Sequence, residues 1–276
     1  PLIFSASGNI DIVGYALSSN TSVTYGYWNL MVAGGNITIS SKGAGGTLYG
    51  AVDFTPAVIK AGGNFTIQGS NKVAGEAVGV AGSSAIGAKY GVNLTSSASM
   101  TIAAGKVNAG TYGNINATGT ISIDATATGN SGMAFNADTG NLSSGGLMTI
   151  IGRAVTGTGI VGINTTATVA LSSAGGIAIS GIGTVGGSTG NIAMLGGITN
   201  TGTTGTGITI SSTYNTSVAN VTNSGANGMR ITGGAGIAAG VTTGGTITGL
   251  GTLSNTGGVM ALSMAQPGAS AYTLEG

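Results

Sequence analysis

The chain has 276 residues, a mass of 26.1 kDa and a net charge of +1, and glycine occupies 56 positions. It contains no Cys and no His, which excludes disulfides, zinc–thiolate sites, haem ligation by these residues and nucleophile–histidine triads. Only 5% of the residues are charged, so a dense basic surface for nucleic acid is excluded too. At 41% hydrophobic residues and only 3 prolines, the composition fits neither a disordered chain nor collagen.

Short strands are predicted along most of the chain, because triplets of the form apolar–small–apolar recur. This two-residue alternation is typical of a half-buried strand. The predicted strands begin at Ile10, Ile37, Phe65, Met100, Ile121, Met148, Ile177 and Ile208. No helix is predicted, since no apolar stripe with a 3.6-residue period is sustained. No apolar run reaches about 20 residues, so no transmembrane helix is expected.

The predicted strands recur every 21–35 residues, which indicates a repeat. A unit of this size cannot bury its own apolar face, but stacked units share a continuous core. Glycine doublets precede several strands, and we expect them to provide φ > 0 at corners. Asparagine at strand ends is expected to form ladders between coils. About ten coils spaced about 4.8 Å apart would make a rod roughly 50 Å long.

Three runs carry a resemblance to a known family: Gly-Gly-Asn-Ile-Thr-Ile-Ser at 34–40, Gly-Gly-Asn-Phe-Thr-Ile-Gln at 62–68 and Thr-Gly-Asn-Ile-Ala-Met at 189–194. They resemble repeats of filamentous-haemagglutinin-type exoproteins of two-partner secretion, and also autotransporter passenger domains. The resemblance covers nearly the whole chain but includes no match to the family's export domain. It implies a right-handed parallel β-helix that is exported to the bacterial surface and acts as an adhesin or fibrous stalk. The sequence itself does not set the handedness.

We therefore predict an all-β chain, a single right-handed parallel β-solenoid over residues 1–276. A subdivision is conceivable at its middle: 1–153 contains most aromatic residues, whereas 154–276 is rich in Gly, Ser, Thr and Ala and resembles a stalk. Beyond Ile208 the apolar triplets become irregular, so the sequence does not define the strand register there.

Acidic residues are the first candidates for chemistry. A glycan-cleaving β-helix would need Asp53, Glu76, Asp124 and Asp138 to converge in one groove. Asp124 and Asp138 are also candidate calcium ligands, because they lie 14 residues apart near amide side chains. No established calcium-loop motif is present, so solvated acids are the default interpretation.

A column of threonines offers an alternative function. Thr stands in the middle of many predicted strands, and regular Thr arrays on flat β-helices can bind ice. The column would contain Thr38, Thr66, Thr101, Thr149 and Thr209, with Thr248 added if Ile247 begins another strand, and Ser122, Ala170 and Ala178 would interrupt it. Thr also has a high intrinsic strand propensity, which explains the column more simply than ice binding does.

One aromatic cluster, Tyr25, Tyr27 and Trp28, is a candidate interaction site. It is interpreted as an apolar cap over the first coils, a contact between subunits or a glycan-binding surface. Asn36 and Asn64 lie in Asn-x-Thr sequons but are expected to have structural roles, and glycosylation of the sequons is left open.

Taken together, the sequence predicts a structural or adhesive protein, secreted or at the cell surface, and no enzyme. No cofactor and no metal are expected. The predicted partners are further copies, stacked head-to-tail through open ends, or molecules on a host or cell surface. The alternatives are a glycan-binding or glycan-cleaving β-helix and an ice-binding protein.

Overall fold

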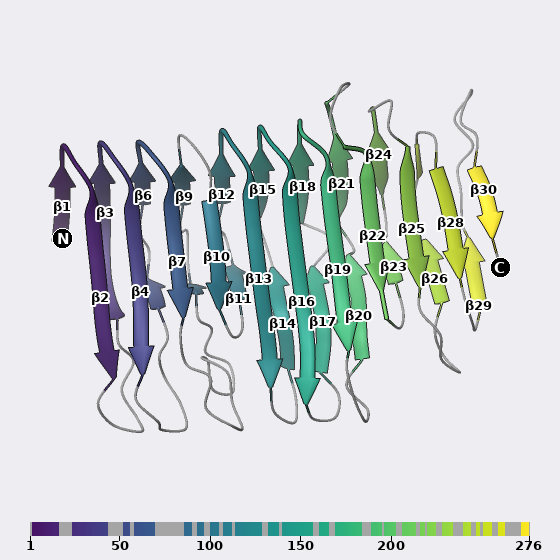
Figure 1. The fold of residues 1–276 in the computed structure, drawn as a ribbon, viewed down its shortest axis with the longest axis horizontal. Helices are drawn as coiled ribbons and strands as arrows, with labels where there is room; N and C mark the ends of the chain where they lie inside the picture. The colour runs from purple at the N-terminus through teal and green to yellow at the C-terminus, as the bar shows by residue number, and fades with distance from the viewer. Residues whose placement is uncertain are drawn as a thin grey trace.

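The computed structural model describes residues 2–16, 24–43, 52–55, 58–69, 86–89, 93–96, 100–104, 107–111, 114–128, 132–137, 140–156, 160–165, 169–183, 189–194, 196–202, 206–213, 216–218, 220–224, 228–233, 240–243, 247–248, 251–255, 259–262 and 272–275. Within these residues the chain consists of short strands and their turns, and no helix occurs. The strands stack side by side along one long axis (Figure 1). The predicted all-β solenoid is confirmed.

The solenoid has three faces, which we call sheets 1, 2 and 3. Sheet 1 contains β2 (Ile10–Ala16), β4 (Ile37–Gly43), β7 (Phe65–Gly69), β10 (Met100–Ala104), β13 (Ile121–Thr128), β16 (Met148–Thr156), β19 (Ile177–Gly183), β22 (Ile208–Ser212), β25 (Met229–Gly233), β28 (Gly251–Asn255) and β30 (Tyr272–Glu275). Its strands pair in that order and all run parallel.

Sheets 2 and 3 join through one strand, β3, and together contain 19 strands. Sheet 2 contains β1 (Leu2–Ala6), the second half of β3 (Thr24–Ala33), β6 (Val58–Ala61), β9 (Asn93–Ser96), β12 (Asn114–Ala117), β15 (Gly140–Ser144), β18 (Val169–Ser173), β21 (Gly197–Asn200), β24 (Val221–Asn223) and β27 (Ile247–Thr248). Sheet 3 contains the first half of β3, β5 (Val52–Thr55), β8 (Ile86–Lys89), β11 (Val107–Thr111), β14 (Gly132–Ala137), β17 (Ile160–Thr165), β20 (Thr189–Met194), β23 (Thr216–Val218), β26 (Gly240–Thr243) and β29 (Val259–Leu262).

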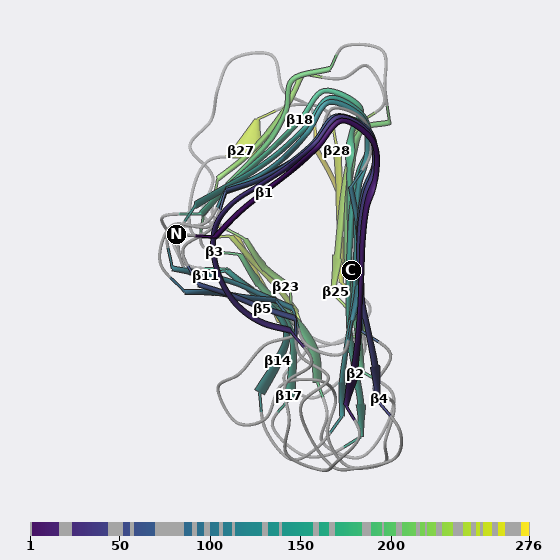
Figure 2. The same cartoon turned by 90° about the vertical axis from the view of Figure 1, so that its left-hand side faces the viewer.

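Each coil runs through sheet 3, sheet 2 and sheet 1 in turn, and the cross-section is a triangle (Figure 2). Seen from the N-terminal end, the chain passes down sheet 1 on the right and advances away from the viewer as it winds clockwise. The solenoid is therefore right-handed, as parallel crossover connections almost always are.

The register of sheet 1 confirms the strand starts that the sequence predicts. Ile10 pairs with Ile37, and the same column continues through Phe65, Met100, Ile121, Met148, Ile177 and Ile208. The structure also extends it beyond Ile208, through Met229, Gly251 and Tyr272. Those last strands were not recognisable because Gly251 interrupts the apolar pattern. Ile247 belongs to sheet 2, so it begins no strand of sheet 1.

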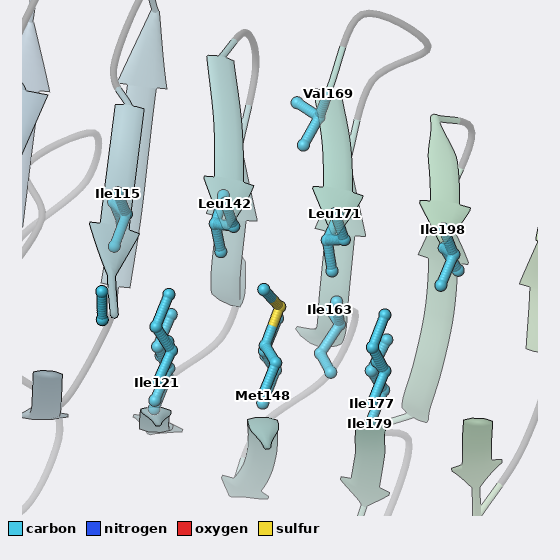
Figure 3. Close-up of a cluster of buried hydrophobic side chains, with 14 of the residues drawn as sticks. Ile115, Ile121, Leu142, Met148, Ile163, Val169, Leu171, Ile177, Ile179 and Ile198 are labelled. Atoms are coloured by element: carbon cyan, nitrogen blue, oxygen red, sulfur yellow. The ribbon is translucent and has the colours of Figure 1, made fainter. Parts of the chain in front are cut away.

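The core is a set of aliphatic columns that follow the axis. Two residues after each strand start of sheet 1 stands an isoleucine or leucine, from Ile12 to Leu274. In the interior, Ile123, Ile150 and Ile179 of this column are all fully buried. Residues such as Leu142 and Leu171 of sheet 2 face it across the triangle (Figure 3). Full burial of such a side chain contributes about 1.5–3 kcal/mol, so regular stacking accounts for the stability of a chain with so few charges.

Candidate functional site

The corner between sheets 2 and 1 carries a series of polar contacts between the described coils. In the first coils this corner is a three-residue turn, and Asn9, Asn36 and Asn64 each come directly before the strand of sheet 1. The Oδ1 atom of Asn9 accepts the N–H of Asn36 at 2.8 Å, and Oδ1 of Asn36 accepts the N–H of Asn64 at 2.8 Å. Asparagines at this corner thus bond from coil to coil as expected, but through Oδ1 to the backbone N–H and not from amide to amide, which gives Asn36 and Asn64 a structural role.

The glycine doublets at this corner work differently from what the sequence suggested. Among the glycines that the structure describes, only Gly140 and Gly176 have positive φ. At Gly35 and Gly63 a Cβ atom would collide with the asparagine Oδ1 of the preceding coil. The expectation of φ > 0 is confirmed at Gly176 of the doublet 175–176 and is wrong for the doublets 34–35, 62–63 and 145–146. At these three doublets glycine is required because successive coils approach so closely.

The inner side of the same corner changes character along the axis. One register column of sheet 2 contains Ala6, Ala33, Ala61, Ser96, Ala117, Ser144, Ser173, Asn200 and Asn223. Those of its members whose side chains are described are buried from Ala33 to Asn223. Small apolar residues at one end therefore give way to hydroxyls and then to amides at the other.

The buried amides complete the backbone hydrogen bonds of longer turns. Asn200 is fully buried, and seven residues, 201–207, separate it from the next strand of sheet 1, whereas three residues do so after Ala33 and Ala61. Its Nδ2 lies 3.4 Å from the carbonyl of Thr206 and 2.8 Å from Oδ1 of Asn223. Asn223 donates to the carbonyl of Gly228 at 2.9 Å, and five residues, 224–228, separate it from β25.

Sequence reasoning missed Asn200 and Asn223. The signal was present as a repeated apolar-Thr-Asn triplet, Ile198-Thr199-Asn200 and Val221-Thr222-Asn223. Their pairing one coil apart follows from the register of β21 and β24. Ser144 and Ser173 make the corresponding contact in earlier coils, with their Oγ atoms 3.1 Å apart.

The calcium candidates do not form a described site. The guanidinium of Arg153 donates two hydrogen bonds to the carboxylate of Asp124, with Nε–Oδ1 at 3.1 Å and Nη2–Oδ2 at 2.9 Å. This hydrogen bond to the carboxylate, opposed by partial burial, raises the pKa of Arg153 above its usual value. Both carboxylate oxygens of Asp124 are therefore already engaged by a cation. Asp138 lies outside the described residues, and the described part of the chain holds no cluster of three metal-ligating side chains.

The acids proposed for a glycan-cleaving groove are only partly covered by the structure. Asp53 belongs to β5 in sheet 3 and Asp124 to β13 in sheet 1, so these two stand on different faces. Glu76 lies outside the residues that the structure describes. The structure does not bring the two described acids together.

Tyr25, Tyr27 and Trp28 all lie in β3, and the structure describes their backbone only. Tyr25 pairs with Asp53 of β5, whereas Trp28 pairs with Leu2 of β1. The cluster therefore spans the corner at which sheet 3 becomes sheet 2. Its role as a cap or interaction site stays a prediction.

The threonines form a column in sheet 1, but hydroxyls are not confined to it. The column contains Asp11, Thr38, Thr66, Thr101, Ser122, Thr149, Ala178, Thr209, Arg230, Thr252 and Thr273. Ala170 and Thr248 belong to sheet 2. There a second column runs through Asn116, Ser143, Ser172, Thr199, Thr222 and Thr248. Two faces thus carry hydroxyl side chains. Strand propensity and the need for an uncharged, solvated surface explain these residues better than one threonine face specialised for ice does.

The end of the solenoid at β1 and β2 leaves apolar side chains open. The register places Phe4 in the column of Met31, yet Phe4 is 42% exposed while Met31 is fully buried. Likewise Ile10 and Ile12 are only partly buried, although their neighbours in the next coil are fully buried.

No helix in the described part of the chain is long and apolar enough to cross a membrane. No known protein family matches the sequence, and neither the curated proteins nor the solved structures contain a significant match. Functional inference therefore depends on the geometry of this chain alone.

Proposed function

We propose that this chain is a structural segment of an extracellular fibre or surface stalk, a stiff rod that holds its two ends apart. The observation that supports this role is the unbroken parallel ladder of sheet 1, which joins all eleven of its described strands from β2 to β30. Its hydrogen bonds run along the long axis. Axial hydrogen bonds and aliphatic columns together resist bending of the rod.

The outer surface is consistent with this role. Described residues on it are mainly Ser, Thr, Asn and Gly, and the one described ion pair, Asp124–Arg153, joins neighbouring coils. Such a surface solvates the rod without strong fields for steering a charged ligand. The export and the bacterial cell-surface location that the family resemblance implies belong to the same proposal.

Electron microscopy and small-angle scattering of the purified chain test the rod. We expect particles of constant width and roughly 50 Å in length per chain, at about 4.8 Å per coil. A length per chain that does not match this rise per coil would contradict the proposal. A concentration series then separates isolated rods from rods that join end to end.

Edge variants test whether rods join through their open ends. The N–H of Ile10 donates to Asn36 O in β4, so the alternation of a parallel strand directs the N–H of Val13 away from β4. Val13→Pro removes this outward donor and should abolish any end-to-end joining while the fold survives. Ser40 pairs with Val13 but its N–H faces β2, so Ser40→Pro should disrupt the fold itself. Joining that persists in a folded Val13→Pro chain would exclude this edge.

A further inference from the structure

Both arginines of the chain, Arg153 and Arg230, lie on the outer face of sheet 1. Arg153 donates to the carboxylate of Asp124 through Nε and Nη2. It shows what an arginine on this face does when a carboxylate lies within reach: the planar guanidinium meets the two oxygens with two hydrogen bonds. Arg230 stands on the same face in different surroundings.

Arg230 is the second residue of β25 and belongs to the outward column that elsewhere contains mainly threonine. Its register partners are Thr209 of β22 on one side and Thr252 of β28 on the other. The three strands lie side by side within the ladder of sheet 1 (Figure 1), so described coils flank Arg230 on both sides. The exposure of its side chain is therefore a property of this face and not of an end of the rod.

The surrounding coils supply no counter-charge to Arg230. Residues 154–274 contain no Asp and no Glu. Glu275 belongs to β30, two strands further along sheet 1 and about 10 Å away at the usual strand spacing. The single ion pair among the described residues is Asp124–Arg153, which leaves Arg230 without a carboxylate within them.

The surface beside Arg230 is more open than the same column in earlier coils. Thr209 is exposed, whereas Ser122, Thr149 and Ala178 at the equivalent positions are half-buried. Arg230 is exposed as well. Because neighbouring strands lie about 4.8 Å apart, one ligand group can reach the guanidinium and this hydroxyl together.

Further hydroxyls stand in the next outward column. Ser211 of β22 pairs with Thr232 of β25, and both side chains are half-buried. The Oγ atoms of Ser211 and Ser180 lie 3.2 Å apart, and Oγ1 of Thr232 lies 3.4 Å from the carbonyl oxygen of Ile210. The sheet thus orients these hydroxyls. Since a hydroxyl both donates and accepts, they suit a ligand that is itself rich in hydroxyls.

The composition of this surface decides between classes of ligand. The described outward side chains of β22 and β25 are Thr209, Ser211, Arg230 and Thr232. They include no apolar anchor for a lipid surface or an amphipathic peptide, and one cation is too few for nucleic acid. A polysaccharide that carries carboxylates matches both features. Laid along the rod, it would meet a new row of the face about every 4.8 Å.

From these observations we propose that Arg230, together with Thr209, Ser211 and Thr232, is a binding site for a carboxylate of an acidic polysaccharide. The guanidinium donates two hydrogen bonds to the carboxylate oxygens, as Arg153 does to Asp124. The three hydroxyls bind hydroxyl groups of the sugar. The single charge acts by contact and needs no long-range field. This site goes beyond the structural role, because a rod does not require it.

The test uses the full chain and three labelled oligosaccharides of matched length: an oligogalacturonate, a sulfated dextran and a neutral dextran. Fluorescence anisotropy measures binding. We expect saturable binding of the oligogalacturonate that weakens with added salt, because exposed charges are screened. The neutral dextran should not bind, and the sulfated dextran should bind more weakly than the oligogalacturonate, because a planar carboxylate matches the guanidinium fork.

Arg230→Gln should weaken oligogalacturonate binding about tenfold or more, because the charge-assisted hydrogen bonds are lost. Arg230→Lys keeps the charge but not the fork, so it should restore only part of the affinity. The matched control is Arg153→Gln, which removes the same charge from the same face. It should leave binding unchanged, since Arg153 is already engaged by Asp124. The unfolding midpoint should stay the same for both Arg230 variants, because this side chain is exposed.

Three results would overturn the proposal. The first is no saturable binding of the oligogalacturonate up to about 1 mM. The second is equal weakening by Arg230→Gln and Arg153→Gln, which would indicate non-specific attraction. The third is an Arg230-dependent site that binds a polyglutamate peptide or the sulfated dextran more tightly, which would assign it to another ligand. None of these results affects the structural role, since the rod shape is measured without any ligand.

Discussion

The first coils and the later coils build the same corner with asparagine on opposite sides of the backbone. Around residues 33–37 and 61–65 the inner position is Ala, and the asparagine stands just before sheet 1, where Asn36 bonds the N–H of Asn64 in the next coil. Around 200–208 and 223–229 the asparagine stands inside and bonds the carbonyls of its own turn.

The difference follows from turn length. Three-residue turns donate their N–H groups to the preceding coil, and the inner residue beneath them is Ala or Ser. Where it is Ser, as at Ser144 and Ser173, its hydroxyl bonds the carbonyl of Gly146. Beneath the longer connections 201–207 and 224–228, the part-buried carbonyls of Thr206 and Gly228 lie within reach of the inner residue, and a carbonyl that loses water requires a donor. One side-chain amide supplies that donor and still bonds its neighbour in the column. Among the described coils, the inner position holds an amide beneath the longer connections and Ala or Ser beneath the three-residue turns.

Placing an amide beneath a short turn should have the largest effect. Ala61 is 2% exposed, and Ala61→Asn would bury an unpaired amide in a space that fits a methyl group. We expect a loss of about 3 kcal/mol or more in the free energy of unfolding, measured by denaturant titration. Ala61→Ser is the control and should change little, because Ser144 sits above a three-residue turn in the same column and lies 2.8 Å from Gly146 O. A stable Ala61→Asn chain would refute the link to turn length.

Adding a methyl group at a corner where an asparagine stands just before sheet 1 should lower the free energy of unfolding by about 1–3 kcal/mol. Gly63→Ala places a Cβ against Oδ1 of Asn36 and the backbone of Gly35, so the two coils must separate. Thermal unfolding measures the loss. If Gly63→Ala were as stable as the unmodified chain, close approach would not be what requires glycine there.

Removing a buried amide beneath a turn should lower the free energy of unfolding by about 2 kcal/mol. Removing the exposed amide of an asparagine just before sheet 1 should lower it by less. Asn200→Ala leaves Thr206 O without its donor in a fully buried site. Asn36→Ala leaves the N–H of Asn64 without Oδ1, but Asn36 is exposed and water can replace it, so about 0.5–1.5 kcal/mol is expected. Equal losses in denaturant titrations of the two variants would contradict the proposed difference between the corners.

The smallest effect is expected for the Asp124–Arg153 ion pair, which joins two coils within sheet 1 and not at a corner. Asp124→Asn breaks the ion pair with Arg153, whose side chains are 42% and 35% exposed, and should cost about 0.2–1 kcal/mol. The loss should shrink in 1 M salt, because exposed charges are screened. Arg153 has a raised pKa, so on the alkaline side the contribution is lost only as the pH rises through that pKa. A loss that does not depend on salt would indicate a packing role.

The fold was predictable because the core depends on alternation and period, and both are visible in the sequence. Every strand start predicted from Ile10 to Ile208 lies in one register column. Register after Ile208 was not predictable, since Gly251 replaces an apolar residue and the coils shorten.

The contacts at the corners were less predictable because they depend on which coil lies beside which. The role of Gly35 is invisible until Asn9 is placed against it. Asp124 and Arg153 are 29 residues apart, about one coil, so opposite charges at that spacing were a usable signal. The sequence did not predict that the side chain of Asn200 points into the core. Its register column contains Ala, Ser and Asn, so no single residue type marks the position.

The register of sheet 1 tolerates coils of unequal length, and this bears on how such a chain can evolve. Phe65 and Met100 are 35 residues apart, Met100 and Ile121 only 21, and yet each pair lies side by side. Insertions into the loops between sheets lower the stability only slightly, since loop closure costs about 0.6 kcal/mol more for each doubling of loop length. Lineages can therefore remodel what projects from the rod, or duplicate a whole turn of it, without having to solve the packing problem again.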